Sequence, residues 1–505
     1  MVMGTSSHVG KSILCAALCR IFYLEGRRVA PFKAQNMALN SFVTKTGGEM
    51  GRAQVVQAEA AGIEPEVTMN PVLLKPTGNS CSQVILLGKV LGNMSAKEYH
   101  QGYSVKAFQT VKEAISILER EYDTLVIEGA GSPAEVNLKD GDIVNMRVAK
   151  YLNAPVILVA DIDRGGALAA LVGTLELLEP EERALVKGLV INKFRGDINL
   201  LTPAIDFLEQ KTGKRVLGVI PYVDLAGIDD EDSVSLERRE KGGAESVTTD
   251  KLDVAVIQTP HIANFTDFTA LAGEPDVSLR YVGKAEDLCC PDVIILPGSK
   301  NTIQDLTFLQ ETGLADEIIA LRQKSTPVIG ICGGYQMLGE SIADPTHTES
   351  KADKMSGLGL LPLHTTLNPP KITVQTLADC RNLNFVGSNI QAQNLPGYEI
   401  HMGRSVLNGQ SPFAIKQRQG EACQTAEGLV SDDGVVLGTY MHGLFDHDIF
   451  RRQIINALRR RRGWPVLSAA VNRHAAKEQT YNRLAQIVRE NLSMEKLRQI
   501  MEVTP

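Results

Sequence analysis

Short apolar runs that alternate with helix-like segments constrain this chain more than any other feature of its sequence. Apolar runs of this length are typical of parallel strands buried on both faces, and parallel strands need the crossover connections that helices supply. The runs form two groups, at residues 28–32, 124–127, 155–160, 188–191 and 216–220, and at residues 253–257, 278–282, 293–296, 328–331 and 435–440. The sequence therefore predicts two α/β domains, each built on a parallel sheet.

A charged stretch without hydrophobic periodicity separates the two groups, and such stretches are typical of linkers. A chain of 505 residues is too long for a single core. We expect domains at residues 1–226 and 251–447, a linker at residues 227–250 and a helical extension at residues 448–505. The extension has one apolar face that must pack against another element, formed by Leu484, Ile487, Val488 and Leu492.

The composition argues against several classes of function. A net charge of −7 at pH 7 disfavours a nucleic-acid or anionic-membrane partner, since both select basic surfaces. No apolar run is long enough to span a bilayer. The eight cysteines show neither CxxC pairs nor zinc-like spacing, and a disulfide framework is implausible in so long a chain. We expect a cytoplasmic protein that acts on small molecules and holds no tightly bound cofactor.

A glycine-rich loop opens the chain, reading GTSSHVGKS at residues 4–12, and a helical pattern follows it. The glycines allow backbone N–H groups to turn toward phosphate oxygens, Lys11 would contact the β- and γ-phosphates of ATP, and the hydroxyl of Ser12 suits Mg²⁺. One residue more separates the glycines than in the standard P-loop, so we expect a variant loop; a simple Gly/Ser turn before a helix is the alternative. The predicted ATP site comprises Gly4, Thr5, Gly10, Lys11 and Ser12. Because only three residues precede Gly4, we expect no signal peptide, and either a short first strand or a misassigned start.

Polar residues follow three strands of the first group, at the sheet edge where ligands of α/β proteins bind. Glu128 and Asp161 each stand at the carboxyl end of an apolar run and could join Ser12 in holding Mg²⁺ through oxygen ligands. Asn192 could offer its amide to the adenine edge of ATP. Each acid could equally cap a helix or face solvent, and Asn192 could be an ordinary turn residue.

The second group contains the pattern of a nucleophile elbow. Residues 330–339 read GICGGYQMLG, so that an apolar run leads to Cys332 and then at once to a glycine pair and a helical pattern. A second apolar run, at residues 435–440, is followed by His442. A cysteine and a histidine at two strand ends of one sheet are placed as a thiolate–imidazole pair requires. A small buried thiol beside a turn is the alternative interpretation of Cys332.

With these residues identified, the chain resembles, almost from end to end, the cobyric acid synthase family, the glutamine-dependent amidases of adenosylcobalamin biosynthesis. The first half resembles the dethiobiotin-synthetase-like P-loop ATPases and the second half the class I glutamine amidotransferases, which implies that fold for each domain. The motifs that carry the resemblance are PFKAQNMALNS at residues 31–41, MNPVLLKP at 69–76, EGAGSPAE at 128–135, NKFRGD at 192–197, LPGSKNT at 296–302, GYEIHMGR at 397–404 and HGLFD at 442–446.

The resemblance implies a glutaminase site in the second half. The thiolate of Cys332 would attack the side-chain amide of glutamine, and His442 would hold the thiolate and protonate the departing ammonia. Backbone N–H groups of Gly333 and of the turn at Gly298 would stabilise the oxyanion, and Gln336 is a further expected contact to glutamine.

The residues after His442 depart from the usual pattern. Many class I amidotransferases have Pro and then Glu there, and the Glu orients the imidazole, whereas this chain has Gly443 and Leu444. We therefore expect a Cys–His dyad. Glu399 is a weak candidate to orient the imidazole, and a structural acid is the preferred interpretation of it.

The resemblance also implies an amidoligase site in the first half. ATP would phosphorylate a substrate carboxylate, and ammonia would displace the phosphate from the acyl phosphate. The substrate would be adenosylcobyrinic acid a,c-diamide, whose b, d, e and g carboxylates would be amidated to give adenosylcobyric acid. The residues expected to contact this corrinoid, each of which could instead be an ordinary surface residue, are Lys33, Gln35, Asn36, Asn40 and Lys75.

Two other functions stay open at this point. The a,c-diamide synthases are a sister family that acts earlier on the same ring. Neutral side chains at Asn36, Asn40 and Ser41 favour the later enzyme, because they accept a polycarboxylate without charge repulsion. A P-loop ATPase switch of the partitioning type, with a glutaminase-like regulatory module, belongs to a different class. The presence of both Cys332 and His442 argues against that switch.

Overall fold

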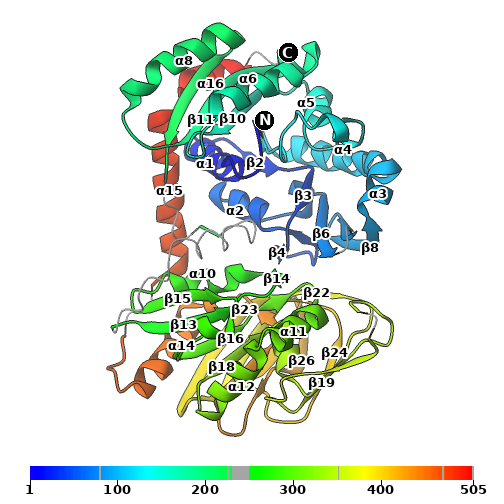
Figure 1. The fold of residues 1–505 in the computed structure, drawn as a ribbon, viewed down its shortest axis with the longest axis vertical. Helices are drawn as coiled ribbons and strands as arrows, with labels where there is room; N and C mark the ends of the chain where they lie inside the picture. Colours follow the sequence, from blue (N-terminus) through cyan, green and yellow to red (C-terminus); the bar gives the residue numbers. More distant parts are fainter. Residues whose placement is uncertain (79–80, 224–227, 230–249, 351, 469–470, 503–505) are drawn as a thin grey trace. The chain divides into compact units, whose positions relative to one another are not determined.

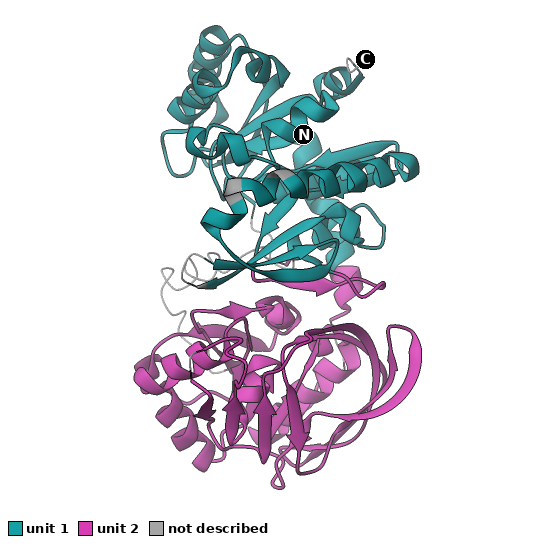
Figure 2. Cartoon of the chain, turned by 90° about the vertical axis from the view of Figure 1, so that its right-hand side faces the viewer, with its two compact units in different colours: residues 1–38, 49–228, 477–505 teal, residues 39–48, 229–476 magenta. Residues whose placement is uncertain are grey.

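The computed structural model describes residues 1–78, 81–223, 228–229, 250–350, 352–468 and 471–502. The chain forms two compact units, of which unit 1 comprises residues 1–38, 49–228 and 477–505, and unit 2 residues 39–48 and 229–476 (Figure 2). The predicted linker at residues 227–250 lies outside the described residues except for residues 228, 229 and 250. Among the helices described, none combines the length and the apolar character that crossing a membrane demands.

A parallel sheet runs through unit 1 (Figure 1). Four of its strands are hydrogen-bonded in the order β1 (Val2–Gly4), β10 (Val156–Asp161), β11 (Val186–Phe194) and β12 (Arg215–Pro221). Strands β2 (Val29–Phe32) and β9 (Thr124–Ile127) pair in parallel, and a parallel bridge from Val2 to Glu128 joins this pair to β1. All five apolar runs predicted in the first half are strands of this arrangement.

Alternate residues of these strands face two different cores. Val2, Ile157 and Val190 pack with helix α1 (Lys11–Leu24), whereas Met3, Leu158 and Leu189 pack with helices α5 (Met146–Leu152), α6 (Ala167–Leu177) and α8 (Ile198–Thr212). Alternation of this kind follows from the two-residue period of a strand. The parallel sheet is therefore covered by helices on both faces, as the continuous apolar runs predict.

A second sheet in unit 1 has no counterpart in the sequence prediction. It consists of β3 (Gln35–Met37), β6 (Val72–Gly78), β7 (Cys81–Leu86) and β8 (Lys89–Ser95), and all of its pairings except β3 with β6 are antiparallel. Strand β5 (Glu49–Gly51) also belongs to unit 1. Its remaining helices are α2 (Arg52–Ala60), η1 (Val67–Met69), α3 (Ala96–Glu98), η2 (Tyr99–Tyr103), α4 (Ser104–Glu121), η3 (Val136–Gly141), α7 (Pro180–Leu185) and α16 (Met494–Glu502).

The end of the chain docks on unit 1. Helix α15 (Arg473–Asn491) buries Leu484 and Val488 in the core that contains α1, and Leu492 follows them there. The N–H of Ser493 donates to the carbonyl of Leu217 over 2.8 Å, next to a bridge between Gly218 and Leu492. Leu484, Val488 and Leu492 of the apolar face predicted for the extension are thus packed in this core, whereas Ile487 is half-buried. Residues 477–502 belong to the P-loop unit rather than forming a body of their own.

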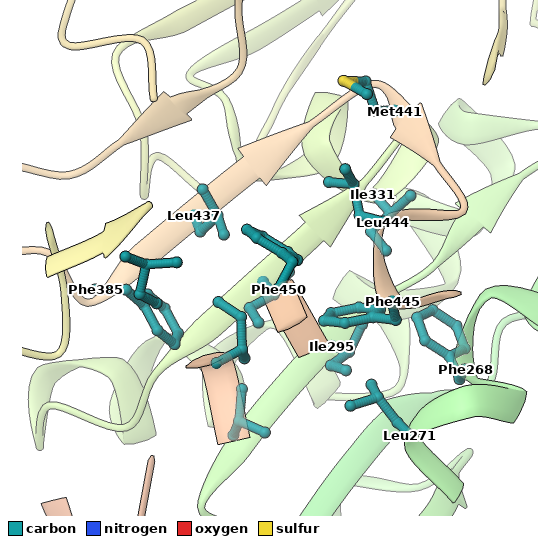
Figure 3. Close-up of a cluster of buried hydrophobic side chains, with 14 of the residues drawn as sticks. Phe268, Leu271, Ile295, Ile331, Phe385, Leu437, Met441, Leu444, Phe445 and Phe450 are labelled. Atoms are coloured by element: carbon teal, nitrogen blue, oxygen red, sulfur yellow. The ribbon is translucent and has the colours of Figure 1, made fainter. Parts of the chain in front are cut away.

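The central sheet of unit 2 has the strand order β15 (Val277–Val282), β13 (Leu252–Ile257), β16 (Val293–Leu296), β18 (Val328–Ile331), β28 (Val436–Thr439) and β27 (Leu429–Val430). All pairings are parallel except that of β27 with β28. The five apolar runs predicted in the second half are five of these strands. Figure 3 shows Ile295, Ile331 and Leu437 of this sheet in one cluster with Phe268, Phe445 and Phe450.

Unit 2 also contains a long antiparallel sheet, which was not predicted. Its strand order is β26 (Glu421–Glu427), β25 (Phe413–Arg418), β22 (Ile372–Phe385), β23 (Ser388–His401) and β29 (Met441–His442). The shorter strands of unit 2 are β4 (Ser41–Val43), β14 (Ile262–Ala263), β17 (Gly298–Ser299), β19 (Ser341–Ala343), β20 (Lys354–Ser356), β21 (Leu363–Thr366) and β24 (Arg404–Leu407). Its helices are η4 (Phe265–Phe268), α10 (Thr269–Ala272), η5 (Ala285–Asp287), α11 (Thr302–Glu311), α12 (Leu314–Gln323), α13 (Gly333–Leu338), η6 (Leu444–Asp446) and α14 (Asp448–Arg461).

Docking of the chain end on β12 makes a stability prediction. A Cβ atom at Gly218 would lie 2.1 Å from the carbonyl oxygen of Asn491. Gly218→Ala should therefore push the backbone at Asn491 away from β12 and lower the free energy of unfolding by about 1–3 kcal/mol. Urea unfolding and limited proteolysis of residues 477–505 measure this loss. Gly173→Ala is the matched control, because a Cβ atom there meets nothing within 4 Å. Parental stability of Gly218→Ala would contradict a contribution of the docked chain end to the free energy of unfolding.

Candidate active sites

Cys332 occupies a strained turn between β18 and α13. Its φ and ψ angles are 54° and −109°, a region that residues other than glycine seldom adopt and that is typical of nucleophile elbows. The N–H of Cys332 donates to the carbonyl of Thr439 over 2.8 Å, which ties the turn to β28. The neighbouring Gly334 cannot carry a side chain, since a Cβ atom would lie 2.1 Å from the carbonyl oxygen of Leu296.

His442 reaches the same place from the adjacent strand. Ile331 is paired with Thr439 in the parallel ladder of β18 and β28, so the residues that follow the two strands emerge side by side. Both Cys332 and His442 are buried, and the thiol of Cys332 lies 3.5 Å from the carbonyl oxygen of Ile400. The sheet register therefore brings together the cysteine and the histidine that the sequence singled out.

A carboxylate that the sequence analysis missed holds the imidazole of His442. Asp267 lies in η4, directly after β14, and its Oδ2 atom is 2.7 Å from Nδ1 of His442. Its Oδ1 atom accepts from the N–H of Gly443 over 3.0 Å. Asp267 is 2% exposed. The expected Cys–His dyad thus has a third residue beside it, in a position to orient the imidazole.

The position of Asp267 explains why sequence reasoning missed it. It is 175 residues away from His442, and no spacing rule connects the two. The available signal was an acid in the buried aromatic run Phe265–Phe268, since a buried carboxylate must have partners. Glu399, the candidate named from the sequence, instead pairs with Arg418 over 2.8 and 3.1 Å, in agreement with its interpretation as a structural acid.

The surroundings of His442 favour its charged form. Burial disfavours the imidazolium, but the adjacent Asp267 carboxylate and Cys332 outweigh burial and raise the pKa of His442 to about 10. The Nε2 atom makes no hydrogen bond with the residues that the structure describes. A buried imidazolium with one nitrogen held by a carboxylate and the other available is suited to stabilise a thiolate and to deliver a proton.

One aromatic ring and two glycines lie around the site. The ring of Tyr398 lies parallel to the imidazole of His442, with centroids 5.0 Å apart and planes 15° apart. Gly298 lies close to the imidazole, since its Cβ position is 3.3 Å from Cε1 of His442. The corresponding position at Gly333 is 2.9 Å from the N atom of Ser299. The structure thus gathers the predicted oxyanion residues Gly298 and Gly333 around Cys332 and His442.

Both polar atoms of the Gln336 side chain form hydrogen bonds with other residues of the protein. Its Oε1 atom accepts from the hydroxyl of Thr302 over 3.1 Å, and its Nε2 atom donates to the carbonyl of Met402 over 2.8 Å and to the hydroxyl of Tyr440 over 3.1 Å. His401 stacks on Tyr440 with centroids 3.8 Å apart, and burial lowers its pKa to about 3. His401 is therefore neutral, in contrast to the charged His442.

In unit 1 the glycine-rich loop curls around the start of α1. Gly10 precedes the helix with φ of 96°, and Nδ2 of Asn192 donates to the carbonyl of Val9 over 2.8 Å. A Cβ atom at Gly10 would lie 2.2 Å from that amide nitrogen, so the loop requires glycine there. The ammonium group of Lys11 donates to the carbonyls of Ser6 and Gly131 over 3.0 and 3.2 Å.

The carboxylate of Glu128 accepts hydrogen bonds from four side chains of this site. Its Oε1 atom accepts from the hydroxyl of Ser12 over 2.8 Å and forms an ion pair with Lys33 over 2.9 Å. Its Oε2 atom accepts from the amide of Gln57 over 2.6 Å and from that of Gln54 over 3.3 Å. Predicted metal ligands Ser12 and Glu128 are therefore in direct contact.

Asp161 is held differently. Its carboxylate pairs with Lys193 over 2.7 Å, and Lys193 also donates to the carbonyl of His8 over 2.6 Å. Within the described part of the chain, no group of three or more His, Cys, Asp or Glu residues is arranged to hold a metal ion. The structure thus offers one hydroxyl and one carboxylate, Ser12 and Glu128, as adjacent oxygen donors, whereas Asp161 is paired with Lys193 of β11.

The residues expected to contact the corrinoid lie in several environments. Lys75 forms a buried ion pair with Glu49 over 2.8 Å, as Lys33 does with Glu128. Gln35 accepts from the hydroxyl of Tyr99 over 2.5 Å. Asn36 is buried, with its amide 3.3 Å from Oε1 of Gln54, and Asn40 is fully buried and belongs to unit 2.

The electrostatics of the Asp267–His442 contact can be tested directly. Because the Asp267 carboxylate raises the pKa of His442, Asp267→Asn should lower that pKa well below its value of about 10. NMR titration with ¹³C-labelled histidine measures the change, with His442→Asn to assign the signal. Glu399→Gln is the matched control, because Glu399 is paired with Arg418, and it should leave the pKa of His442 almost unchanged. An equal shift in both variants would contradict this assignment.

Comparison with known families agrees with the two-unit architecture. Residues 1–234 match the model of the CobQ/CobB/MinD/ParA nucleotide binding domain, and residues 253–450 match that of the CobB/CobQ-like glutamine amidotransferase domain. Among solved structures, PurLQS from Thermotoga maritima is similar with a TM-score of 0.30 and 17% identity, covering 46% of this chain and 98% of that one; this likeness is too weak to support a conclusion.

Curated relatives match along almost the whole chain. Cobyric acid synthase of Desulfitobacterium hafniense is 55% identical, with 99% of this chain and 97% of the relative covered. The cobyric acid synthase of Moorella thermoacetica is 53% identical with 99% and 96% covered, and that of Yersinia enterocolitica 52% identical with 99% and 98% covered. The chain therefore belongs to the cobyric acid synthase family, the glutamine-dependent amidoligases of cobalamin biosynthesis.

Proposed function

We propose that this enzyme uses ATP and glutamine to amidate the b, d, e and g carboxylates of adenosylcobyrinic acid a,c-diamide, giving adenosylcobyric acid. The observation that carries the glutaminase half is the strained turn of Cys332 beside an imidazole held by a buried carboxylate. Cobyric acid synthase relatives, similar over 99% of the chain, support the choice of acceptor over that of the a,c-diamide synthases. The partitioning-type switch has no comparable support.

The glutaminase step would begin with attack of the Cys332 thiolate on the side-chain carbonyl carbon of glutamine. The tetrahedral oxyanion would be stabilised by backbone N–H groups of Gly333 and of the turn at Gly298. His442 would give its Nε2 proton to the departing nitrogen, and Asp267 would hold the imidazole by Nδ1 throughout. Water would then hydrolyse the thioester to release glutamate, with His442 as the base.

The amidoligase step would place the triphosphate of ATP on the glycine-rich loop. Lys11 would stabilise the charge that develops on the γ-phosphoryl group while a corrinoid carboxylate attacks it. Ammonia would displace phosphate from the acyl phosphate. Lys33 and Lys75 are proposed as contacts to the polycarboxylate, and each would exchange its present partner, Glu128 or Glu49, for a substrate carboxylate. Asn192 is proposed to contact the adenine.

Ser12 of the glycine-rich loop and Glu128 next to it fit Mg²⁺. Hard oxygen donors are what this ion prefers, and the hydroxyl of Ser12 and the carboxylate of Glu128 are 2.8 Å apart. We propose that these two residues hold the ion that accompanies ATP, with Asp161 as a further acid near the loop. A bound Mg²⁺ would neutralise phosphate charge.

Two substitutions should separate the half-reactions. Cys332→Ala should abolish glutamine-driven synthesis and leave synthesis from ammonium salts largely intact, because it removes only the nucleophile. Lys11→Ala should lower synthesis from either nitrogen source by orders of magnitude while glutamine hydrolysis survives. Each variant is the control for the other, and turnover with both donors is the measurement. Equal loss with both donors in Cys332→Ala would contradict the glutaminase assignment.

The acceptor can be identified from the products. With the a,c-diamide corrinoid, ATP, Mg²⁺ and glutamine, mass spectra over time should show successive acid-to-amide shifts that end at four. Because one site must admit four positions, partly amidated species should dissociate and appear transiently. An end point of two amidations, with cobyrinic acid preferred as substrate, would assign the chain to the a,c-diamide synthases instead.

A further inference from the structure

Residues 39–48 belong to unit 2, although the residues on both sides of them in sequence belong to unit 1 (Figure 2). The side-chain amide of Gln375, on β22, donates to the carbonyl of Val43, and that of Gln419 donates to the carbonyl of Lys45 over 2.9 Å. Gly47 has φ of 85°, and its Cβ position is 2.8 Å from Nε2 of Gln419, so only glycine fits. We call residues 39–48 the inserted segment; it is fixed on the antiparallel sheet of unit 2.

The inserted segment holds the turn that carries Asp267. The N–H of Ser41 donates to Oδ1 of Asn264 over 2.9 Å, and both residues are buried. Asn264 has φ of 54° and directly precedes η4, and its carbonyl accepts from the N–H of Asp267 over 3.0 Å. The buried amide oxygen of Asn264 thus depends on Ser41, and the turn that presents Asp267 to His442 depends on Asn264.

The same segment also contacts the aromatic ring that stacks on the imidazole. Phe42 meets the ring of Tyr398 edge to face, with centroids 5.5 Å apart and planes 63° apart. Tyr398 in turn lies parallel to His442. Val43, 0% exposed, packs with Tyr398 and Ile400, and the carbonyl of Ile400 is the group that the Cys332 thiol contacts. One short segment therefore contacts Tyr398 directly and is connected to Asp267 through Asn264.

We propose that the inserted segment positions His442 for glutamine hydrolysis, through Ser41 and Asn264 to Asp267 and through Phe42 to Tyr398. This inference rests on the proposed glutaminase function. A catalytic imidazole must be held within a fraction of an ångström of its working geometry, and residues that do not touch substrate supply that restraint. Phe42, Tyr398 and Asn264 are thus positioning residues.

The chain connects this restraint to the amidoligase half. The inserted segment follows residues 31–38, which contain proposed corrinoid contacts, and it leads directly into Glu49, whose carboxylate pairs with Lys75. Part of the sequence that surrounds the proposed acceptor site therefore sets the geometry of the residue that releases ammonia.

The test uses full-length Phe42→Ala and Asn264→Gly. Glycine tolerates the positive φ at residue 264, so that variant loses the amide oxygen without backbone strain. Glutamine hydrolysis should lose about tenfold in kcat, while KM for glutamine stays within about twofold, because glutamine binding is not touched. The alkaline limb of the pH profile should move to lower pH, because a loosened Asp267 no longer raises the pKa of His442 as far.

Two matched variants control for general damage. Phe42→Tyr keeps the aromatic ring, and Lys45→Ala changes an exposed side chain whose backbone carbonyl still binds Gln419; both should hydrolyse glutamine at the parental rate. Parental kcat and pH profile in Phe42→Ala and Asn264→Gly would overturn the proposal. So would an equal loss in Lys45→Ala or in ammonium-driven synthesis. Failure of the proposed function itself would be distinct, since the parent protein would then not hydrolyse glutamine.

Discussion

A buried carboxylate organises each of the two sites, and the need to satisfy it dictates much of what surrounds it. Asp267 and Glu128 are both almost fully buried, where an ionised carboxylate is tolerated only with several donors. Asp267 therefore takes the imidazole of His442 and the N–H of Gly443. Glu128 takes a hydroxyl, an ammonium group and two amides. Each carboxylate fixes the groups on which the proposed chemistry depends.

These carboxylates have different consequences because their partners differ. Asp267 faces an imidazole, so its charge raises the pKa of His442 and stabilises an imidazolium beside the thiol of Cys332. Glu128 faces Ser12 and Lys33, a hydroxyl and a cation that ligands could displace or share. The first arrangement is a preorganised proton donor. The second is a polar cluster at the site proposed for ATP.

The sequence indicated the repeating parts of the fold well and the irregular parts poorly. Every apolar run assigned to a parallel strand is one, because burial on both faces leaves an unmistakable composition. The strands β6 to β8 and β22 to β26 were not predicted, since sheets that are half exposed and irregularly bulged give a weak pattern. The pairing of Cys332 with His442 was predictable from two strand ends. That of Asp267 with His442 was not, because nothing local distinguishes that acid.

The sequence alone indicated the groups available to this protein: a glycine-rich loop before a helix, a cysteine in the pattern of a nucleophile elbow, a histidine after another strand, and the family to which the chain belongs. These are local properties, which depend on a few consecutive residues and on the strand period. Only the tertiary structure decided which partners complete each site. Asp267 and Tyr398 meet His442, and the inserted segment meets Asn264 and Tyr398, through contacts between residues far apart in the chain. The end of the chain packs on the P-loop unit for the same reason. Such contacts are selected by the packing of whole elements, which no short stretch of sequence records.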